Sequence, residues 1–243
     1  MPRAVAVNVG ANTNEPGVRG PLFPDGSFEF VPIPETEPTD GAVPTYRDLD
    51  LRVDLPAGAL DRPVHLDPEF AEYPRCERYT YGDPHGVKAR PLLELSAGDW
   101  ALFYATLAPR DESGTPVDGT EDHPDWVVPD WGAYLVGGFE LARDPVPGDA
   151  YPDLAAKERA AFATNAHVRR ASFDAAVLLL GTDRSGLFDR PVPLSRDAGT
   201  EPNDVVTDLS ADSGRGPWWR RPLRFDAAAT AALARRLPGR PVG

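Results

Sequence analysis

The chain has a single cysteine and no long apolar run, and each of these features excludes a class of protein. Cys76 is the only cysteine, which excludes an internal disulfide and any cysteine-rich zinc site. No run approaches the roughly 20 apolar residues needed to cross a bilayer. The opening Met-Pro-Arg and the short apolar stretch after it lack the length and cleavage site of a signal peptide. We therefore expect a soluble, cytoplasmic protein with no membrane partner.

Lysine is almost missing as well. Lys88 and Lys157 are the only two, and 38 acidic against 25 basic residues leave a net charge of -13. Such acidity normally argues against nucleic-acid binding, because phosphate contacts carry much of that affinity. It is typical of a halophilic protein with a hydrated acidic surface, and also of a GC-rich genome, which favours arginine over lysine. Both interpretations stay open.

The 28 prolines and 22 glycines predict many turns and few long helices. Apolar runs predict five strands, at residues 4–9, 27–33, 100–107, 134–141 and 175–180. Helices are expected at residues 153–163 and, with Asp226 as N-cap, at 226–237. Strands outnumber helices, so we predict an α+β fold in one domain spanning residues 1–243, with a mixed or barrel-like sheet and a C-terminal helix.

Two segments carry no regular pattern. Residues 109–130 contain seven acids and one base and join two strands that look paired, so we expect an acidic loop there. Residues 199–217 form a second irregular, acidic segment. Neither resembles a linker between domains.

The opening stretch, residues 4–35, places polar groups around two short apolar runs. Asn12, Arg19 and Glu29 crowd a hairpin signal with Asp25-Gly26 at its tip. This opening resembles the third family of nucleotide-modification-associated domains, and the resemblance extends from residue 5 to about 194. It implies work beside enzymes that modify bases in DNA or nucleotides, without implying a reaction.

A second resemblance rests on residues 95–107 and 133–141. A Gly-Asp turn, an apolar strand, a loop and a strand containing Gly137-Gly138 look like PUA-like barrels, which bind RNA or modified bases. Glycines at that point would let a backbone or ligand approach closely.

Two further segments match the family pattern. In residues 165–170, His167 is a candidate general acid or base and a phosphate contact together with Arg169, and Asn165 is a candidate binding residue. Tyr81 and Asp83 could stack on a base and accept from its exocyclic amine. The alternatives are a helix-terminal histidine with surface arginines, and a Gly-Asp turn with a packed tyrosine.

Several constellations are absent. The chain has no phosphate loop, no dinucleotide-binding fingerprint and no nucleophile elbow. Its histidines show no metal-ligand spacing, and although His65, Asp67 and His85 could meet in space, we predict no metal site. The sequence does not indicate which cofactor, if any, the protein uses.

The C-terminal residues 214–241 hold seven arginines and one acid beside Trp218 and Trp219. Base stacking and phosphate contact would need such a patch. A helix whose tryptophans pack on the core explains it equally directly, and we favour that interpretation.

These observations predict a protein that recognises or helps process a modified base, with a nucleotide or nucleic acid as partner. Asn12, Arg19 and Asp25 would make polar contacts, converging with Tyr81, Asp83 and His167 on one concave surface. Two alternatives stay open. One is an enzyme acting on a free nucleotide or small metabolite, with Asp25 or Glu29 and His167 as acid and base. The other is a non-catalytic interaction module of a defence or restriction system.

Overall fold

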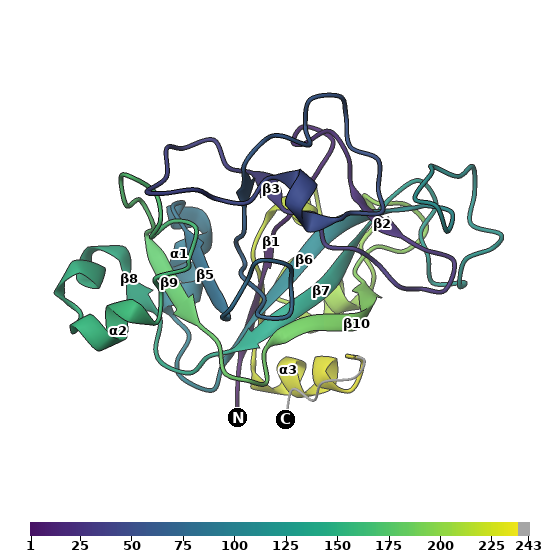
Figure 1. Cartoon of the computed structure of the whole chain (residues 1–243). Coiled ribbons are helices and arrows are strands. Elements are labelled where there is room, and N and C mark those ends of the chain that lie inside the picture. Colours follow the sequence, from purple (N-terminus) through teal and green to yellow (C-terminus); the bar gives the residue numbers. More distant parts are fainter. Residues whose placement is uncertain (238–243) are drawn as a thin grey trace.

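A mixed sheet forms the centre of the computed structural model, which describes residues 1–237 (Figure 1). Its strands follow the order β10-β7-β6-β1-β11, and β2 also pairs with β6. The bounds are β1 Ala4–Asn8, β2 Gly20–Leu22, β6 Trp100–Pro109, β7 Gly132–Glu140, β10 Gly186–Pro193 and β11 Leu223–Phe225. β1 and β2 run parallel to β6, whereas β7 runs antiparallel to it.

Strand β6 is buried along its whole length, which explains its continuous apolar sequence. Alternate residues of a strand point to opposite faces. Phe103 accordingly joins Val5 and Val7 of β1 in one core cluster, whereas Trp100 joins Ala4 and Ala6 in another. The main sheet therefore has an apolar core on each face.

Two small sheets accompany the main one. β3 (Ile33–Pro34) pairs with β4 (Val64–His65), and the three-stranded sheet has the order β5-β9-β8. The bounds of these three strands are β5 Thr80–Asp83, β8 Val146–Pro147 and β9 Val177–Leu180. β5, β9 and the helix α1 (Gly86–Leu93) lie beside the main sheet, on its left in Figure 1.

The remaining regular structure is short. α2 spans Ala156–Ala160 and α3 spans Ala227–Ala234. 3₁₀ turns occur at Tyr46–Leu49, Gly148–Asp153 and Trp218–Arg220, and a π turn occurs at Val205–Leu209. None of the helices within residues 1–237 is long and apolar enough to cross a membrane.

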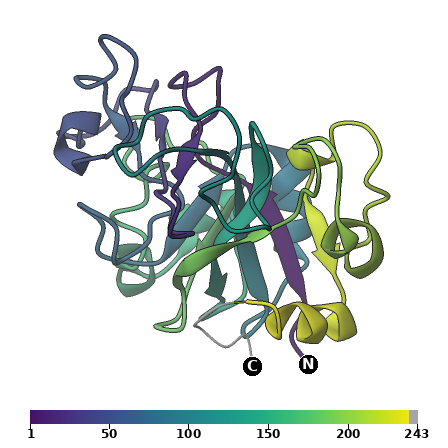
Figure 2. The ribbon, with the colours of Figure 1, turned by 90° about the vertical axis from the view of Figure 1, so that its right-hand side faces the viewer.

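The C-terminal helix begins where the sequence predicts. The Asp226 carboxylate accepts a hydrogen bond from the Ala229 N–H at 2.8 Å, which satisfies one free donor of the first turn. Leu233 of this helix packs with Trp218 and Val206 in the second core cluster. Seen from the side, these C-terminal segments cover one face of the main sheet (Figure 2).

The α+β class and the mixed sheet are confirmed, but the PUA-like barrel is wrong. β10 and β11 lie at opposite edges of the sheet order and do not pair with each other, so the sheet is open. Pro191 and Pro193 give β10 fewer backbone donors, which suits an edge strand.

The predicted strand at 27–33 is also wrong, apart from a β-bridge between Leu22 and Phe28 at the hairpin and its last residue in β3. The segment is buried in part, but its carbonyls have partners outside any ladder. The Tyr73 hydroxyl donates to the Phe30 carbonyl at 2.8 Å, and the Tyr46 hydroxyl donates to the Pro32 carbonyl at 2.7 Å. Two tyrosine hydroxyl groups therefore donate to carbonyls that the backbone N–H groups of a neighbouring strand would otherwise contact.

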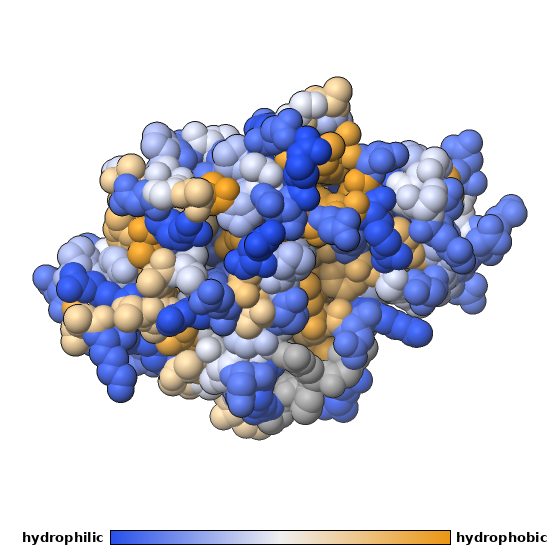
Figure 3. Space-filling view, viewed as in Figure 1, coloured by the Kyte–Doolittle hydropathy of each residue, from blue (hydrophilic) through white to orange (hydrophobic). Residues whose placement is uncertain are grey.

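The two irregular segments behave differently. Residues 109–130 form a loop between the paired strands β6 and β7, whose far end is buried at Val127 and Val128. Residues 199–217 are not irregular throughout, because the π turn buries Val205 and Val206. On the face shown in Figure 3, hydrophilic side chains dominate and apolar ones show between them near the centre.

Candidate functional site

A polar pocket of about 500 Å³ opens between the end of β1, strand β5, the start of α1 and the loop that follows α2. Five chain segments far apart in sequence supply its walls. The residues that line it are Asn8, Val9, Gly10, Asn12, Ile33, Thr36, Glu37, His65, Asp67, Tyr81, Gly82, Asp83, Pro84, His85, Lys88, His167, Arg170 and Asp174.

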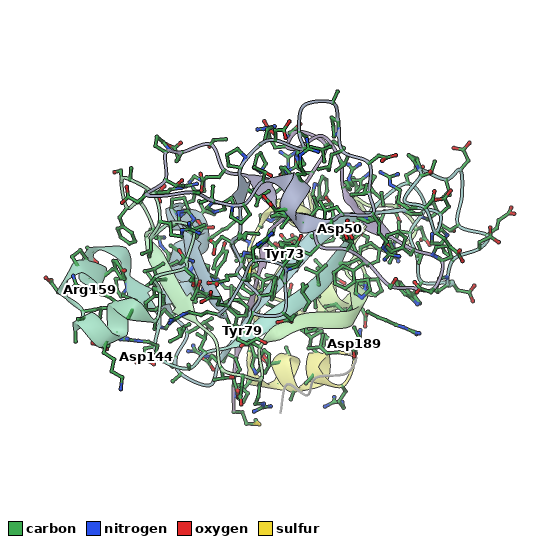
Figure 4. The ribbon with its side chains drawn as sticks, in the orientation of Figure 1. Asp50, Tyr73, Tyr79, Asp144, Arg159 and Asp189 are labelled. Carbon is green, nitrogen blue, oxygen red and sulfur yellow. The ribbon has the colours of Figure 1, made fainter. Side chains whose placement is uncertain are left out.

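An aromatic cluster of the first core supports this region. The Tyr81 and Phe103 rings are 5.1 Å apart, and Phe103 lies 4.7 Å from Phe139. Tyr73 and Tyr79 lie in front of the main sheet in Figure 4, and the Tyr79 ring packs edge-on against Phe139. The site therefore rests on closely packed rings, which hold the strand β5 in place.

His65 is oriented by the β3–β4 pair. Ile33 is opposite His65 in the register, and Glu35 follows β3 directly. The His65 Nδ1 and the Glu35 carboxylate are 2.6 Å apart, with both side chains at most 5 % exposed. Glu35 thereby fixes the imidazole so that Nε2 faces the pocket side.

His167 is oriented in the same way, from the loop that follows α2. Its Nδ1 lies 2.7 Å from the Asp174 carboxylate, and its backbone N–H donates to the Asn165 side chain at 3.0 Å. The rings of His65 and His167 meet edge to face, with 4.8 Å between their centroids. Two buried histidines, each held by a carboxylate, therefore face each other.

Asp67 lies between them. Its Oδ2 is 3.5 Å from the His167 Nε2 and 3.9 Å from the His65 Nε2. The Gly82 N–H and the Asn165 side-chain amide donate to the same carboxylate at 3.0–3.1 Å. Within residues 1–237, this is the group of histidine and acidic side chains whose ligand atoms could hold a metal ion, and these atoms all lie within 4.8 Å of one another.

Gly82 cannot be replaced without moving this centre. A Cβ at this position would lie 2.8 Å from the His167 ring and 3.2 Å from the Asn165 side-chain oxygen. The missing side chain leaves room for the imidazole and lets the backbone N–H reach Asp67.

Arg170 connects the outer carboxylates. Its guanidinium lies 2.8 Å from Glu35 and 2.6 Å from Asp174. Burial would raise the pKa of Glu35, but hydrogen bonds from His65 and Arg170 outweigh it and lower that pKa to about 2. Burial would lower the pKa of His167, but the Asp67 and Asp174 carboxylates outweigh it and raise that pKa.

The other wall carries a lysine. The Lys88 ammonium donates to the Asn8 carbonyl at 2.9 Å and lies 3.4 Å from the Asp83 carboxylate. Asp83 also accepts from the Tyr81 hydroxyl at 2.7 Å and from the His85 N–H at 2.7 Å. One of only two lysines in the chain is therefore held at the pocket, with its side chain 27 % exposed.

The pocket brings together four of the residues that the sequence singled out: Asn12, Tyr81, Asp83 and His167. Asn165 is fully buried beside them and donates to Asp67. The Tyr81 side chain is buried and its ring packs on Phe103, so its face is not open to a base.

The other predicted residues lie outside the lining of this pocket. Asp25 is exposed and accepts from the Ser27 N–H in the hairpin turn. Glu29 is half-buried and accepts from the Arg52 N–H. The Arg19 guanidinium lies over the Trp131 ring, 4.5 Å from its centroid.

Arg169 also points elsewhere, since its guanidinium donates to the Ala42 carbonyl at 2.6 Å. Its neighbour Arg170 is the arginine that lines the pocket. The predicted segment therefore lines the pocket, but through Arg170 and not through Arg169.

Sequence reasoning missed four groups in and around the pocket, which are Glu35, Gly82, Lys88 and Asp174. Glu35 and Asp174 hold the two histidines, while Lys88 contacts Asp83 and Gly82 contacts Asp67. No recognisable spacing in the sequence marks any of these contacts. His65 and Asp67 do carry a signal: they are two apart at the end of a strand, where alternate side chains share a face. The structure brings them together with His167, whereas the backbone N–H of His85 bonds to Asp83.

Three of the six arginines in residues 214–237 have acidic partners of their own. Arg221 pairs with Asp212, Arg224 with Glu94 and Arg236 with Asp204, at 2.6–2.8 Å. Trp218 is fully buried and donates to the Thr200 carbonyl. Arg240 lies outside the described residues. Packing on the core, the favoured interpretation, agrees with this arrangement.

An open mixed sheet with an enclosed histidine–carboxylate cluster defines an α+β protein with a polar small-ligand pocket. The model of the family described as Nucleotide modification associated domain 3 matches residues 3–235, so the chain belongs to this family. The match extends past residue 194 and includes α3. The comparisons with curated proteins and with solved structures give no match.

Proposed function

We propose that this protein is an enzyme of nucleotide modification that binds a free nucleotide in the pocket between β1, β5, α1 and the loop after α2. The observation that carries the proposal is the convergence of His65, Asp67 and His167, each at most 5 % exposed, on that pocket. Buried titratable groups that line a cleft are typical of active sites, and the pKa of one of the three, His167, is raised by its carboxylate neighbours. The family name supplies the link to nucleotides.

The size and lining of the pocket suit a mononucleotide. Small-molecule sites commonly measure about 300–1,000 Å³ and use a few fixed polar groups for orientation. Lys88 offers an ammonium group to a phosphate from one wall, and the histidine–carboxylate cluster lies on the other. We propose that the phosphate lies near Lys88 and the reacting part of the nucleotide near the cluster. Asp25 and Glu29 are left out of the proposed site.

A free nucleotide is favoured over a long nucleic acid because part of the C-terminal positive charge is already neutralised. Arg221, Arg224 and Arg236, three of the six arginines in residues 214–237, each contact an acid, which reduces the positive charge available to a polyanion. The net charge of -13 also repels a polyanion at long range.

Calorimetric titration of the full chain with the common ribo- and deoxyribonucleoside monophosphates tests the proposal. We expect at least one of them to bind, and Lys88→Met to weaken that binding by about tenfold or more, because hydrogen bonds to charged groups contribute about 1.5–3 kcal/mol. Lys157→Met is the matched control, since this second lysine is exposed on α2.

Two results would count against the proposal. Binding of short single-stranded DNA without binding of any monomer would replace the free nucleotide by a base within a strand. Binding of neither, or equal losses in the two lysine variants, would remove the nucleotide site from this pocket.

A further inference from the structure

We propose that His65, Asp67 and His167 form a binding site for one divalent first-row transition-metal ion. The inference concerns the pocket described above, but it rests on the arrangement of these three side chains and not on the proposed nucleotide. Their ligand atoms lie within 4.8 Å of one another, and the three side chains are 2–5 % exposed.

The hydrogen bonds of His65 and His167 determine which of their ring nitrogens are free to bind an ion. Each Nδ1 faces a carboxylate at 2.6–2.7 Å, closer than the Arg170 guanidinium at 3.3–3.4 Å, so we assign to each Nδ1 a proton that it donates to the carboxylate. In a neutral imidazole the Nε2 then keeps its lone pair. Both Nε2 atoms face the Asp67 Oδ2, at 3.5 and 3.9 Å. Three electron-rich atoms thus point at one another.

A positive charge between these atoms relieves that arrangement. One proton on the His167 Nε2 would serve only the contact with Asp67 and would leave the His65 Nε2 without a donor. Protons on both Nε2 atoms would create two imidazolium rings with centroids 4.8 Å apart in a buried site, where like charges repel strongly. A single dication satisfies both lone pairs and the carboxylate at once. The charges nearby agree, because the four carboxylates Glu35, Asp67, Asp83 and Asp174 outnumber the cations Lys88 and Arg170 by two.

The hydrogen-bond partners of the three side chains are of the kind that commonly hold metal ligands in place. Histidine ligands generally donate their other ring N–H to a carboxylate or carbonyl, which fixes the ring and raises its basicity. Glu35 and Asp174 do this here, and Arg170 holds both of them. Asp67 is held in turn by the Gly82 N–H.

Ligand type indicates the class of metal. Two imidazoles and one carboxylate suit iron, cobalt, zinc and their neighbours, whereas magnesium and calcium prefer oxygen ligands. Bonds of about 2.0–2.2 Å put neighbouring ligand atoms about 3 Å apart. The two distances to the Asp67 Oδ2, 3.5 and 3.9 Å, are close to this value, whereas the widest pair, up to 4.8 Å apart, must move closer when the ion binds. All three residues line the pocket, which leaves the remaining coordination positions facing it, as in catalytic metal sites.

The test uses the full chain, free of any affinity tag and stripped by a chelator, titrated with Co²⁺ alone. Calorimetry and visible absorption report stoichiometry and affinity. We expect one equivalent to bind with a Kd below about 10 µM (about -7 kcal/mol). Asp67→Asn and His167→Gln should each weaken binding at least 100-fold, and Glu35→Gln by about 10- to 100-fold.

His85→Gln is the matched control, because His85 lines the same pocket but is not part of the cluster. It should bind Co²⁺ as the unchanged chain does. Loss of binding in His85→Gln equal to that in Asp67→Asn, or unchanged binding in Asp67→Asn, would overturn the assignment. So would an unchanged chain that takes up less than a tenth of an equivalent.

A second measurement needs no variant and so does not depend on the folding of one. Proton NMR of the Co²⁺-loaded chain should show two exchangeable, paramagnetically shifted imidazole N–H signals, one for each Nδ1–H bound to a carboxylate. Fewer than two would overturn the two-histidine site. Titrating nucleotides in the presence of chelator separates the two proposals, since the metal site can fail while nucleotides bind, and the reverse.

Discussion

The two faces of the main sheet are covered in different ways. On the face of Trp100, the C-terminal segments close over the strands, and Trp218 and Leu233 fill the space between them. On the face of Phe103, the second sheet and long connecting segments leave a polar pocket with buried histidines and carboxylates. The first face is filled by apolar packing, whereas the second keeps buried charged groups beside a pocket.

The charged groups show the same difference. Three C-terminal arginines each have one acidic partner near the surface, such as Arg236 with Asp204. Arg170 instead contacts two carboxylates and is 11 % exposed. Surface pairs of the first kind contribute little, while buried networks are costly to break. A concentration of charge in the sequence is therefore a weaker guide to function than the burial of a few charges.

Replacing Trp218 by alanine should have the largest effect on stability. The indole is fully buried and donates to the Thr200 carbonyl at 2.9 Å, so its removal leaves a cavity and an unpaired acceptor. We expect a loss of about 3–5 kcal/mol in the free energy of unfolding. Urea denaturation followed by circular dichroism measures it. A loss below 1 kcal/mol, well under that range, would show that this face is not a tightly packed core.

Arg170→Met should cost about 3 kcal/mol, because it leaves Glu35 and Asp174 without their shared cation. The same denaturation experiment checks it. If the pocket face owed its stability to apolar packing alone, methionine would be tolerated, and a stability equal to that of the unchanged chain would contradict our account of the site.

Gly82→Ala should separate folding from function on the pocket face. The added Cβ would lie 2.8 Å from the His167 ring, so the imidazole must move. We expect a loss of about 1–3 kcal/mol in stability, together with at least tenfold weaker nucleotide binding by calorimetry. The control is Gly86→Ala, where a Cβ meets nothing within 4 Å and where, as at Gly82, φ is not positive. Unchanged nucleotide binding in Gly82→Ala would place the ligand away from His167.

Arg236→Ala should have the smallest effect. Its partner is Asp204 at 2.6 Å, and the two side chains are 43 % and 51 % exposed. Solvent and salt screen such a pair, so we expect less than about 1 kcal/mol in the free energy of unfolding. Thermal and urea denaturation at low and high salt measure it. A loss as large as that of Arg170→Met would remove the contrast between the two faces.

Much of the fold could be predicted from local sequence. The apolar runs at 4–9, 100–107, 134–141 and 175–180 correspond to β1, β6, β7 and β9, within a few residues at each end. The N-cap at Asp226 is confirmed as well. These elements follow from burial and from capping chemistry, both of which act within a few residues along the chain.

Other elements depended on distant partners. Residues 27–33 have the composition of a strand, but tyrosines 46 and 73 take two of the carbonyls that a neighbouring strand would have used. Helix α2 spans Ala156–Ala160, although helix formers extend over 153–163. Pro152 lies in the preceding 3₁₀ turn, which ends at Asp153. The helix α1 was not predicted, since Pro91 lies inside it.

The candidate site shows the same division between features set by local sequence and features set by distant contacts. By itself, the sequence determined the family, the α+β class, the apolar strands and the two segments, around Tyr81 and around His167, that line the pocket. Only the tertiary structure decided which groups meet there. Glu35, His65, Gly82 and Asp174 come from separate segments, and their distances depend on how β3, β4, β5 and the loop after α2 pack together. Strand and cap signals act between chain neighbours, whereas the orientation of an imidazole is set by a carboxylate up to 30 residues away along the chain.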